Sequence, residues 1–102
     1  MSWAMDELQA RARRQLDGMH DFQDGLASIL VREESADGLV TVAVDGNGAL
    51  RELRLAPGID RLGGAGVGAA IVSTAALAAQ RAFARRAALT ETFVATFAGL
   101  VE

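Results

Sequence analysis

Apolar residues recur at steps of three and four along the first quarter of the chain, and this spacing predicts an amphipathic helix. The apolar positions are Met5, Leu8, Ala12, Leu16, Met19, Phe22 and Leu26. The opposite face is charged, and Glu7–Arg11 and Arg13–Asp17 are spaced as ion pairs one helical turn apart. We expect a helix over residues 5–28. Such a helix is about 33 Å long, longer than a small sheet, so part of it should project or pack on a second subunit.

From residue 29 the apolar pattern changes to alternation, which is typical of β-strands. Ile29–Ser35 predicts a short strand, and Leu39–Asp45 alternates valine with other residues. The turn sequence Asp-Gly-Asn-Gly at 45–48 follows at once. Glycine and asparagine accept the positive φ that tight hairpins require, so Ala49–Leu55 should pair with the preceding strand. We expect a three-stranded antiparallel meander over residues 29–55.

A second helical pattern follows a glycine-rich stretch, Ile59–Gly66, which we interpret as a connector. One face of the pattern is rich in alanine and carries Val67, Ile71, Ala75, Ala78 and Ala82. Residues 67–98 should form a C-terminal helical region, either as one helix or with a short third helix that starts near Thr90. The element order is thus α-β-β-β-α, with two long helices flanking the sheet. This is an α+β layout in a single domain over residues 1–102.

The uncharged segment Leu62–Gln80 has about the length of a membrane span. Its composition is wrong for one, because Gly, Ala, Ser and Thr dominate it and large aliphatic residues are few. We interpret it as a small-residue helix that packs closely on another helix, and we expect no membrane partner.

The central strand is apolar on both faces, which predicts a homodimer. Val40, Val42 and Val44 point to one side, while Leu39, Thr41 and Ala43 point to the other. A chain of 102 residues buries a modest fraction of its unfolded surface, so a second subunit would help to stabilise it. We expect one sheet face to carry the helices and the other to help form the subunit contact. The candidate interface residues are Leu39, Val40, Val42, Val44, Leu53 and Leu55.

The residue types exclude most catalytic classes. The chain has no cysteine, and its one histidine, His20, stands beside Asp21, which points elsewhere on a helix. Asp17, Asp21 and Asp24 predict a solvated stripe rather than a general acid–base set. The glycine run at 63–68 lacks the lysine of a Walker loop and follows no βαβ strand. We predict a protein with no enzymatic activity, cofactor, metal or small-molecule substrate.

A leading amphipathic helix, the sequence GLVTVAVDGNGALRELRL followed by Pro57, and a long helix containing AAIVSTAALAAQRA come in that order along the chain. This arrangement resembles the YbaB/EbfC family of small bacterial nucleoid-associated proteins. The resemblance extends from about Met5 to about Arg86 and rests on the order and spacing of the parts rather than on any single motif. The alanine- and arginine-rich composition is similar to an actinobacterial branch of the family.

The resemblance implies an αβββα homodimer that binds double-stranded DNA with little sequence specificity, in the cytoplasm and on the nucleoid. Such binding needs positive charge along a phosphate track. The candidate residues are Arg11, Arg13 and Arg14 in the first helix, Arg51 and Arg54 beside the hairpin, and Arg81, Arg85 and Arg86 in the second helix. The last three have no close acidic neighbour in the sequence, which makes them the strongest candidates.

An alternative function remains open at this point. The net charge is −3, which argues against a uniform attraction to nucleic acid. The last strand ends in Ala56-Pro57 where the family usually has Asp-Pro, and the second helix opens with GGAGVGAA instead of a charged run. The alternative is a protein-interaction module of the same fold that does not bind DNA, for example one associated with type VII (ESX) secretion.

Overall fold

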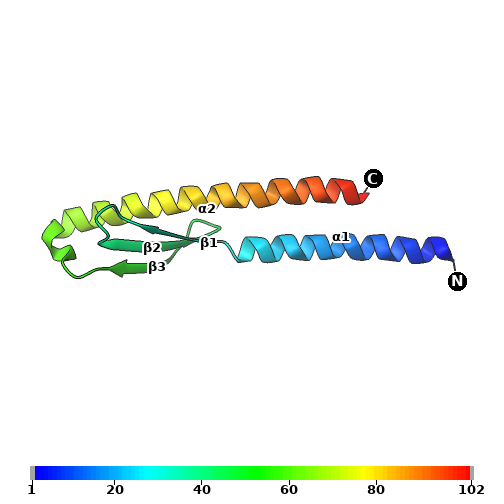
Figure 1. The fold of residues 1–102 in the computed structure, drawn as a ribbon, viewed down its shortest axis with the longest axis horizontal. Helices are drawn as coiled ribbons and strands as arrows, with labels where there is room; N and C mark the ends of the chain where they lie inside the picture. The colour runs from blue at the N-terminus through cyan, green and yellow to red at the C-terminus, as the bar shows by residue number, and fades with distance from the viewer. Residues whose placement is uncertain (1, 102) are drawn as a thin grey trace.

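Two long helices and a three-stranded antiparallel sheet make up the fold, in the order α-β-β-β-α. The computed structural model describes residues 2–101. The elements are α1 (Trp3–Ala27), β1 (Leu30–Glu34), β2 (Val40–Asp45), β3 (Leu50–Leu55), the 3-10 turn η1 (Ile59–Leu62) and α2 (Gly63–Val101) (Figure 1). The sheet order is β1-β2-β3 with both pairs antiparallel. The predicted α+β class and the predicted meander are therefore confirmed.

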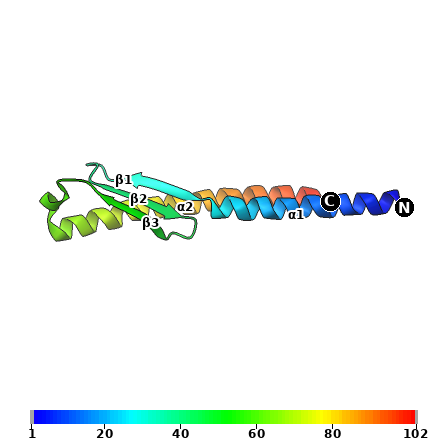
Figure 2. The same ribbon diagram turned by 90° about the horizontal axis from the view of Figure 1, so that it is seen from below.

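Helix α2 runs along most of the molecule and connects its two halves. Its first half covers the sheet, and its second half lies beside α1, which runs in the opposite direction (Figures 1 and 2). We call α1 together with residues 86–101 of α2 the arm. The molecule extends over 74 × 19 × 15 Å, and its radius of gyration is 20.8 Å. A compact domain of this length would have a radius of about 13 Å, so the chain leaves much of its surface uncovered.

Helix α1 begins after the N-cap residue Ser2, and most of its residues are exposed. The Met5 backbone N–H donates to Ser2 Oγ at 3.4 Å. Neither of the predicted ion pairs, Glu7–Arg11 and Arg13–Asp17, forms among the residues that the structure describes. Two long, solvated side chains lose rotamer entropy on pairing, and the screened attraction does not offset that loss. No residue of α1 is fully buried.

The core lies between α2 and the inner face of the sheet. Val40, Val42 and Val44 of β2 are at most 1% exposed. They pack with Ala78 and Ala82 of α2, which are both completely buried, in one cluster. The small alanine side chains let the helix approach the strand closely, and the β-branched valines fill the space between them.

The β1–β2 turn is held by a side-chain network that lowers one pKa. Ser35 Oγ donates to Asp37 Oδ1 at 2.7 Å, and the Leu39 backbone N–H donates to the same oxygen at 3.0 Å. Both bonds favour the ionised carboxylate, so the pKa of Asp37 lies below its usual value. Because the folded pKa is depressed, this contribution to stability is present above the unfolded pKa and is lost as the pH falls through the folded one.

Replacing Ser35 by alanine should raise the pKa of Asp37, because the hydroxyl donor is the largest cause of the lowered value. An NMR titration of the Asp37 side-chain carboxyl measures the change. Ser28→Ala is the matched control, because the Ser28 hydroxyl donates to the Gly25 carbonyl and does not reach this turn. An unchanged Asp37 pKa in Ser35→Ala would show that the hydroxyl does not hold the carboxylate.

The β2–β3 turn requires glycine at position 48, for which the structure gives two reasons. Gly48 has a φ of 82°, and a Cβ added there would lie 2.7 Å from Cζ of Phe83 on α2. Gly48→Ala should therefore lower the free energy of unfolding by about 1 to 2 kcal/mol through backbone strain. The loss should be larger if the Phe83 ring cannot move away from the new Cβ. Chemical denaturation measures the loss. In the control, Gly68→Ala, the new Cβ meets no atom within 4 Å on the helix, so stability should stay equal or rise.

The glycine-rich stretch before α2 differs from the expected connector. Residues 59–62 form a 3-10 turn, and α2 already begins at Gly63 rather than near Val67. It then continues without a break to Val101, so there is no third helix at Thr90, whose hydroxyl donates to the Arg86 carbonyl. Each glycine costs about 1 kcal/mol relative to alanine in a helix, but Ala70 and Ile71 pack against the core and propagate the helix backwards through the run.

By length and composition alone, one helical stretch among the described residues, Ile59–Gly99, could cross a membrane. Four arginines interrupt it: Arg61 donates to the Gly58 carbonyl, and Arg81, Arg85 and Arg86 contact the sheet or its turn through the bonds described below.

Candidate nucleic-acid interface

The first group of arginines stands on the outer half of α1. Arg11, Arg13 and Arg14 are all exposed, and none forms an ion pair with any part of the chain that the structure describes. Arg11 and Arg13 lie about 200° apart around the helix, so the group presents charge on more than one side. These three guanidinium groups are therefore free to contact phosphates.

The second group lies where α2 passes over the sheet, and its first member is ion-paired. Arg81 Nη1 donates to Glu33 Oε1 of β1. Glu33 lies 48 residues away in the sequence. Arg81 has no acidic residue near it in the sequence, since the pair exists only once α2 has packed across β1. This arginine is thus partly neutralised within the protomer.

Arg85 and Arg86 also donate hydrogen bonds to the sheet end of the molecule. Arg85 Nη1 donates to the Leu30 carbonyl at 3.4 Å. Arg86 Nη1 donates to the Gly46 carbonyl at 3.3 Å and to Asn47 Oδ1 at 2.8 Å. These bonds hold α2 to the first strand and to the β2–β3 turn. Both guanidinium groups retain unused donors, because each has five N–H groups in total.

The hairpin arginines are split between a paired and a free one. Arg51 Nη1 lies 3.8 Å from Asp45 Oδ2. Arg54 is exposed and has no ion-pair partner in the described range 2–101.

The arginine groups lie far apart along the molecule. Arg86 stands at the base of the arm, and Arg11 is about 25 Å further along the arm at 1.5 Å per residue. The arginines therefore form separate groups and not one continuous track on a single protomer.

The outer face of the sheet carries an ion pair that the sequence analysis did not single out. Arg32 and Glu52 bind each other through both guanidinium nitrogens, one bond being 3.2 Å long. Their strands both place them opposite Ala43, which is fully buried. The Arg32 hydrogen bond lowers the pKa of Glu52, and the same bond raises the pKa of Arg32. The register of the predicted strands could have revealed this pair, because it places opposite charges on either side of the small residue Ala43 in the central strand.

The three valines predicted for the dimer interface lie inside the protomer, on the side that α2 covers. Because these valines are buried, a second subunit could reach only the other predicted interface residues, Leu39, Leu53 and Leu55. Leu39 is half-buried at the start of the hairpin.

Strand β3 keeps its inner face open. Leu53 and Leu55 pair with Val42 and Val40, and so they belong to the same sheet face, yet they are 43% and 45% exposed. The reason is that α2 packs mainly on β1 and β2. Leu50 is also exposed, and the register sets it beside Val44 on this face, although the sequence analysis missed it. An uncovered apolar strand edge of this kind is a candidate contact surface.

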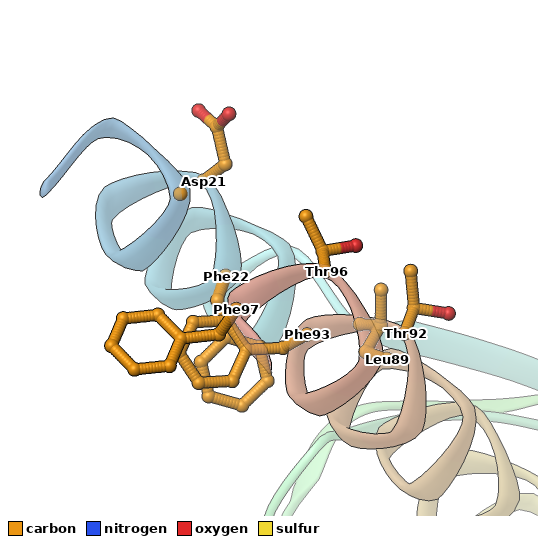
Figure 3. A pocket seen from close by; sticks show the side chains of 8 residues that line it. Asp21, Phe22, Leu89, Thr92, Phe93, Thr96 and Phe97 are labelled. Atoms are coloured by element: carbon orange, nitrogen blue, oxygen red, sulfur yellow. The ribbon is translucent and has the colours of Figure 1, made fainter. Parts of the chain in front are cut away.

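A groove between α1 and α2 carries stacked aromatic rings. The rings of Phe22 and Phe93 are stacked with centroids 4.4 Å apart, and those of Phe93 and Phe97 are 5.4 Å apart. Figure 3 shows the three rings on one side of the helix pair, with Asp21 on the other. The lining is almost entirely apolar, and no group of three potential metal ligands occurs among the described residues. The groove therefore offers packing rather than acid–base chemistry.

Comparison with known proteins identifies the family of this chain. The model of the YbaB/EbfC DNA-binding family matches residues 1–97, and the chain therefore belongs to that family. The family is a DNA-binding family without enzymatic activity. No curated protein matches the chain significantly.

Proposed function

We propose that this protein binds double-stranded DNA as a homodimer, with little sequence specificity, and that it acts on the nucleoid in the cytoplasm. The observation that carries the proposal is membership of a DNA-binding family over residues 1–97. Three exposed α1 arginines without an ion-pair partner among the described residues support it, because guanidinium groups that are not already paired bind phosphates best.

Low specificity follows from the kind of contact that the chain can make. Arginines scattered over two sides of a helix can neutralise phosphates, but base recognition needs several side chains aligned in one groove. We propose Arg11, Arg13 and Arg14 as the main phosphate contacts. Arg54, Arg85, Arg86, Arg51 and Arg81 are secondary, in that order, because Arg85 and Arg86 donate to uncharged oxygens, whereas the charges of Arg51 and Arg81 are partly neutralised by carboxylates.

The homodimer is proposed from the open β3 face and the extended shape. Leu50, Leu53 and Leu55 are apolar, exposed and side by side, and a second copy would cover them. The dimer doubles each arginine group. With two weak halves on one particle, binding to a long polyanion becomes stronger than either half alone could provide.

A fluorescence anisotropy titration against two unrelated duplexes, each at low and at moderate salt, tests the proposal. The expected result is equal affinity for both duplexes and a steep loss of affinity with salt. No binding at low salt would reject the proposal. It would favour the alternative protein-interaction function, to which the net charge of −3 also points, and a pull-down would then be the next experiment.

A further inference from the structure

The ion pair that joins α2 to β1 has one nearly buried and one exposed member. The side chain of Glu33 is 12% exposed, whereas that of Arg81 is 58% exposed. Glu33 lies opposite Val42 in the sheet register, so its side chain belongs to the inner face of the sheet, beneath α2. The carboxylate is therefore the fixed member of the pair, and the guanidinium group is the member that reaches solvent.

A nearly buried carboxylate needs a cation beside it. Taking an ionised carboxyl group out of water is costly, and removing its partner leaves that cost uncompensated. Arg81 is the one cationic residue within ion-pair distance of Glu33 in the part of the chain that the structure describes. A phosphate that drew Arg81 away would leave the Glu33 carboxylate unpaired beneath the helix. The pair should therefore resist competition from DNA.

The other two ion pairs lack this property. The side chains of Arg32 and Glu52 are 56% and 40% exposed, so both charges stay solvated if that pair opens. Asp45, which lies near Arg51, accepts hydrogen bonds from two backbone N–H groups of its own turn, and these bonds stabilise its charge without the arginine. Glu33 is thus the carboxylate that depends most on its arginine.

The Glu33–Arg81 pair changes the charge that the middle of α2 offers to a phosphate. Arg81 and Arg85 are one helical turn apart, and both side chains reach β1. Arg85 donates to the uncharged Leu30 carbonyl and forms no ion pair within residues 2–101. Of these two neighbouring cations, one keeps its charge and the other is neutralised from inside the protomer.

We infer that the Glu33 carboxylate is an internal competitor of DNA phosphates, which occupies Arg81 and thereby lowers the affinity of the protein for DNA. The inference rests on the DNA binding of the proposed function and adds a residue that limits its strength. Glu33 itself touches no DNA and acts only through Arg81. The fold in this way keeps the middle of α2 from binding phosphates and leaves the α1 arginines as the main contacts.

Glu33→Gln tests the inference, because it removes the charge and keeps an oxygen that accepts from Arg81. Glu34→Gln is the matched control, since Glu34 is the next residue of β1, is exposed and forms no ion pair among the described residues. The two substitutions change the net charge equally. Affinity for one duplex is measured by fluorescence anisotropy over a salt series, and circular dichroism verifies the fold of each variant.

Glu33→Gln should bind DNA several-fold more tightly than Glu34→Gln. Its slope of log affinity against log salt should be steeper by up to about 2, because a dimer gains two phosphate contacts at about 0.9 each. Arg81→Gln alone should leave the affinity close to that of the wild type, since the charge of Arg81 is already neutralised. Adding Glu33→Gln to Arg81→Gln should then give no gain beyond that of Glu34→Gln.

Equal affinities and slopes for Glu33→Gln and Glu34→Gln would overturn the inference. A gain from Glu33→Gln that persists in the Arg81→Gln background would also overturn it, because Glu33 would then act through its charge alone. So would a several-fold loss of affinity in Arg81→Gln, a result that does not depend on whether Glu33→Gln folds. Absence of DNA binding by the wild type and by every variant would overturn the proposed function as well, and is thereby distinguished from the other outcomes.

Discussion

Replacing Arg11, Arg13 and Arg14 together by glutamine should lower the affinity for duplex DNA at least about tenfold, which corresponds to about 1.4 kcal/mol. These side chains have no ion-pair partner among the described residues, so their charge is available to phosphates. A homodimer would lose six charges. Each phosphate contact contributes about 0.9 to the slope of log affinity against log salt, so the slope should fall by up to about 5. Anisotropy titrations over a salt series measure both quantities.

Arg32→Gln is the control for this experiment. Arg32 is bound to Glu52 by two hydrogen bonds, so its loss should leave the DNA affinity and the salt slope close to those of the wild type. Circular dichroism should show an intact fold in the triple variant, because the three side chains are exposed. If the triple variant binds as tightly and with the same slope as the wild type, α1 does not carry the phosphate contacts.

Ala78→Leu should lower the free energy of unfolding by about 1 to 3 kcal/mol. Ala78 is completely buried where α2 lies closest to the valines of β2, so a larger side chain has no space there. For a domain of this size, each kcal/mol corresponds to about 4 to 8 °C in Tm. Thermal unfolding followed by circular dichroism measures the shift.

Ala84→Leu is the comparison for Ala78→Leu, since Ala84 is exposed on the same helix. The helix propensities of alanine and leucine are close, so the exposed substitution should change stability by no more than about 0.5 kcal/mol. Equal Tm values for the two variants would mean that α2 does not pack tightly on β2.

The elements with local signals were predictable from the sequence. The hairpin at residues 45–48 follows from glycine and asparagine in a two-strand context, and Asp45 closes it by accepting from the Asn47 and Ala49 backbone N–H groups. The helix of the first quarter follows from its period. The start of α2 at Gly63 could not be predicted in this way, because residues 63–66 are helical through packing further along the helix and not through their own propensity.

The candidate site was less accessible to sequence reasoning, because its decisive features are contacts between distant segments. Arg81 lacked an acid nearby in the sequence, but the fold supplies Glu33 from β1. Periodicity correctly grouped Leu8 and Leu16 on one face, yet it could not say whether the same chain covers that face. Alternation likewise identified the apolar positions of β2 and β3 without showing that α2 covers only the former.

The most direct measurement of the central claim is sedimentation velocity of a short, fluorescently labelled duplex with increasing amounts of the protein at low salt. We expect a complex whose smallest form contains one duplex and two chains, and which dissociates as salt is added. A duplex that sediments unchanged at every protein concentration would contradict the claim that the protein binds DNA. A stable complex with a single chain would contradict the claim that it does so as a dimer.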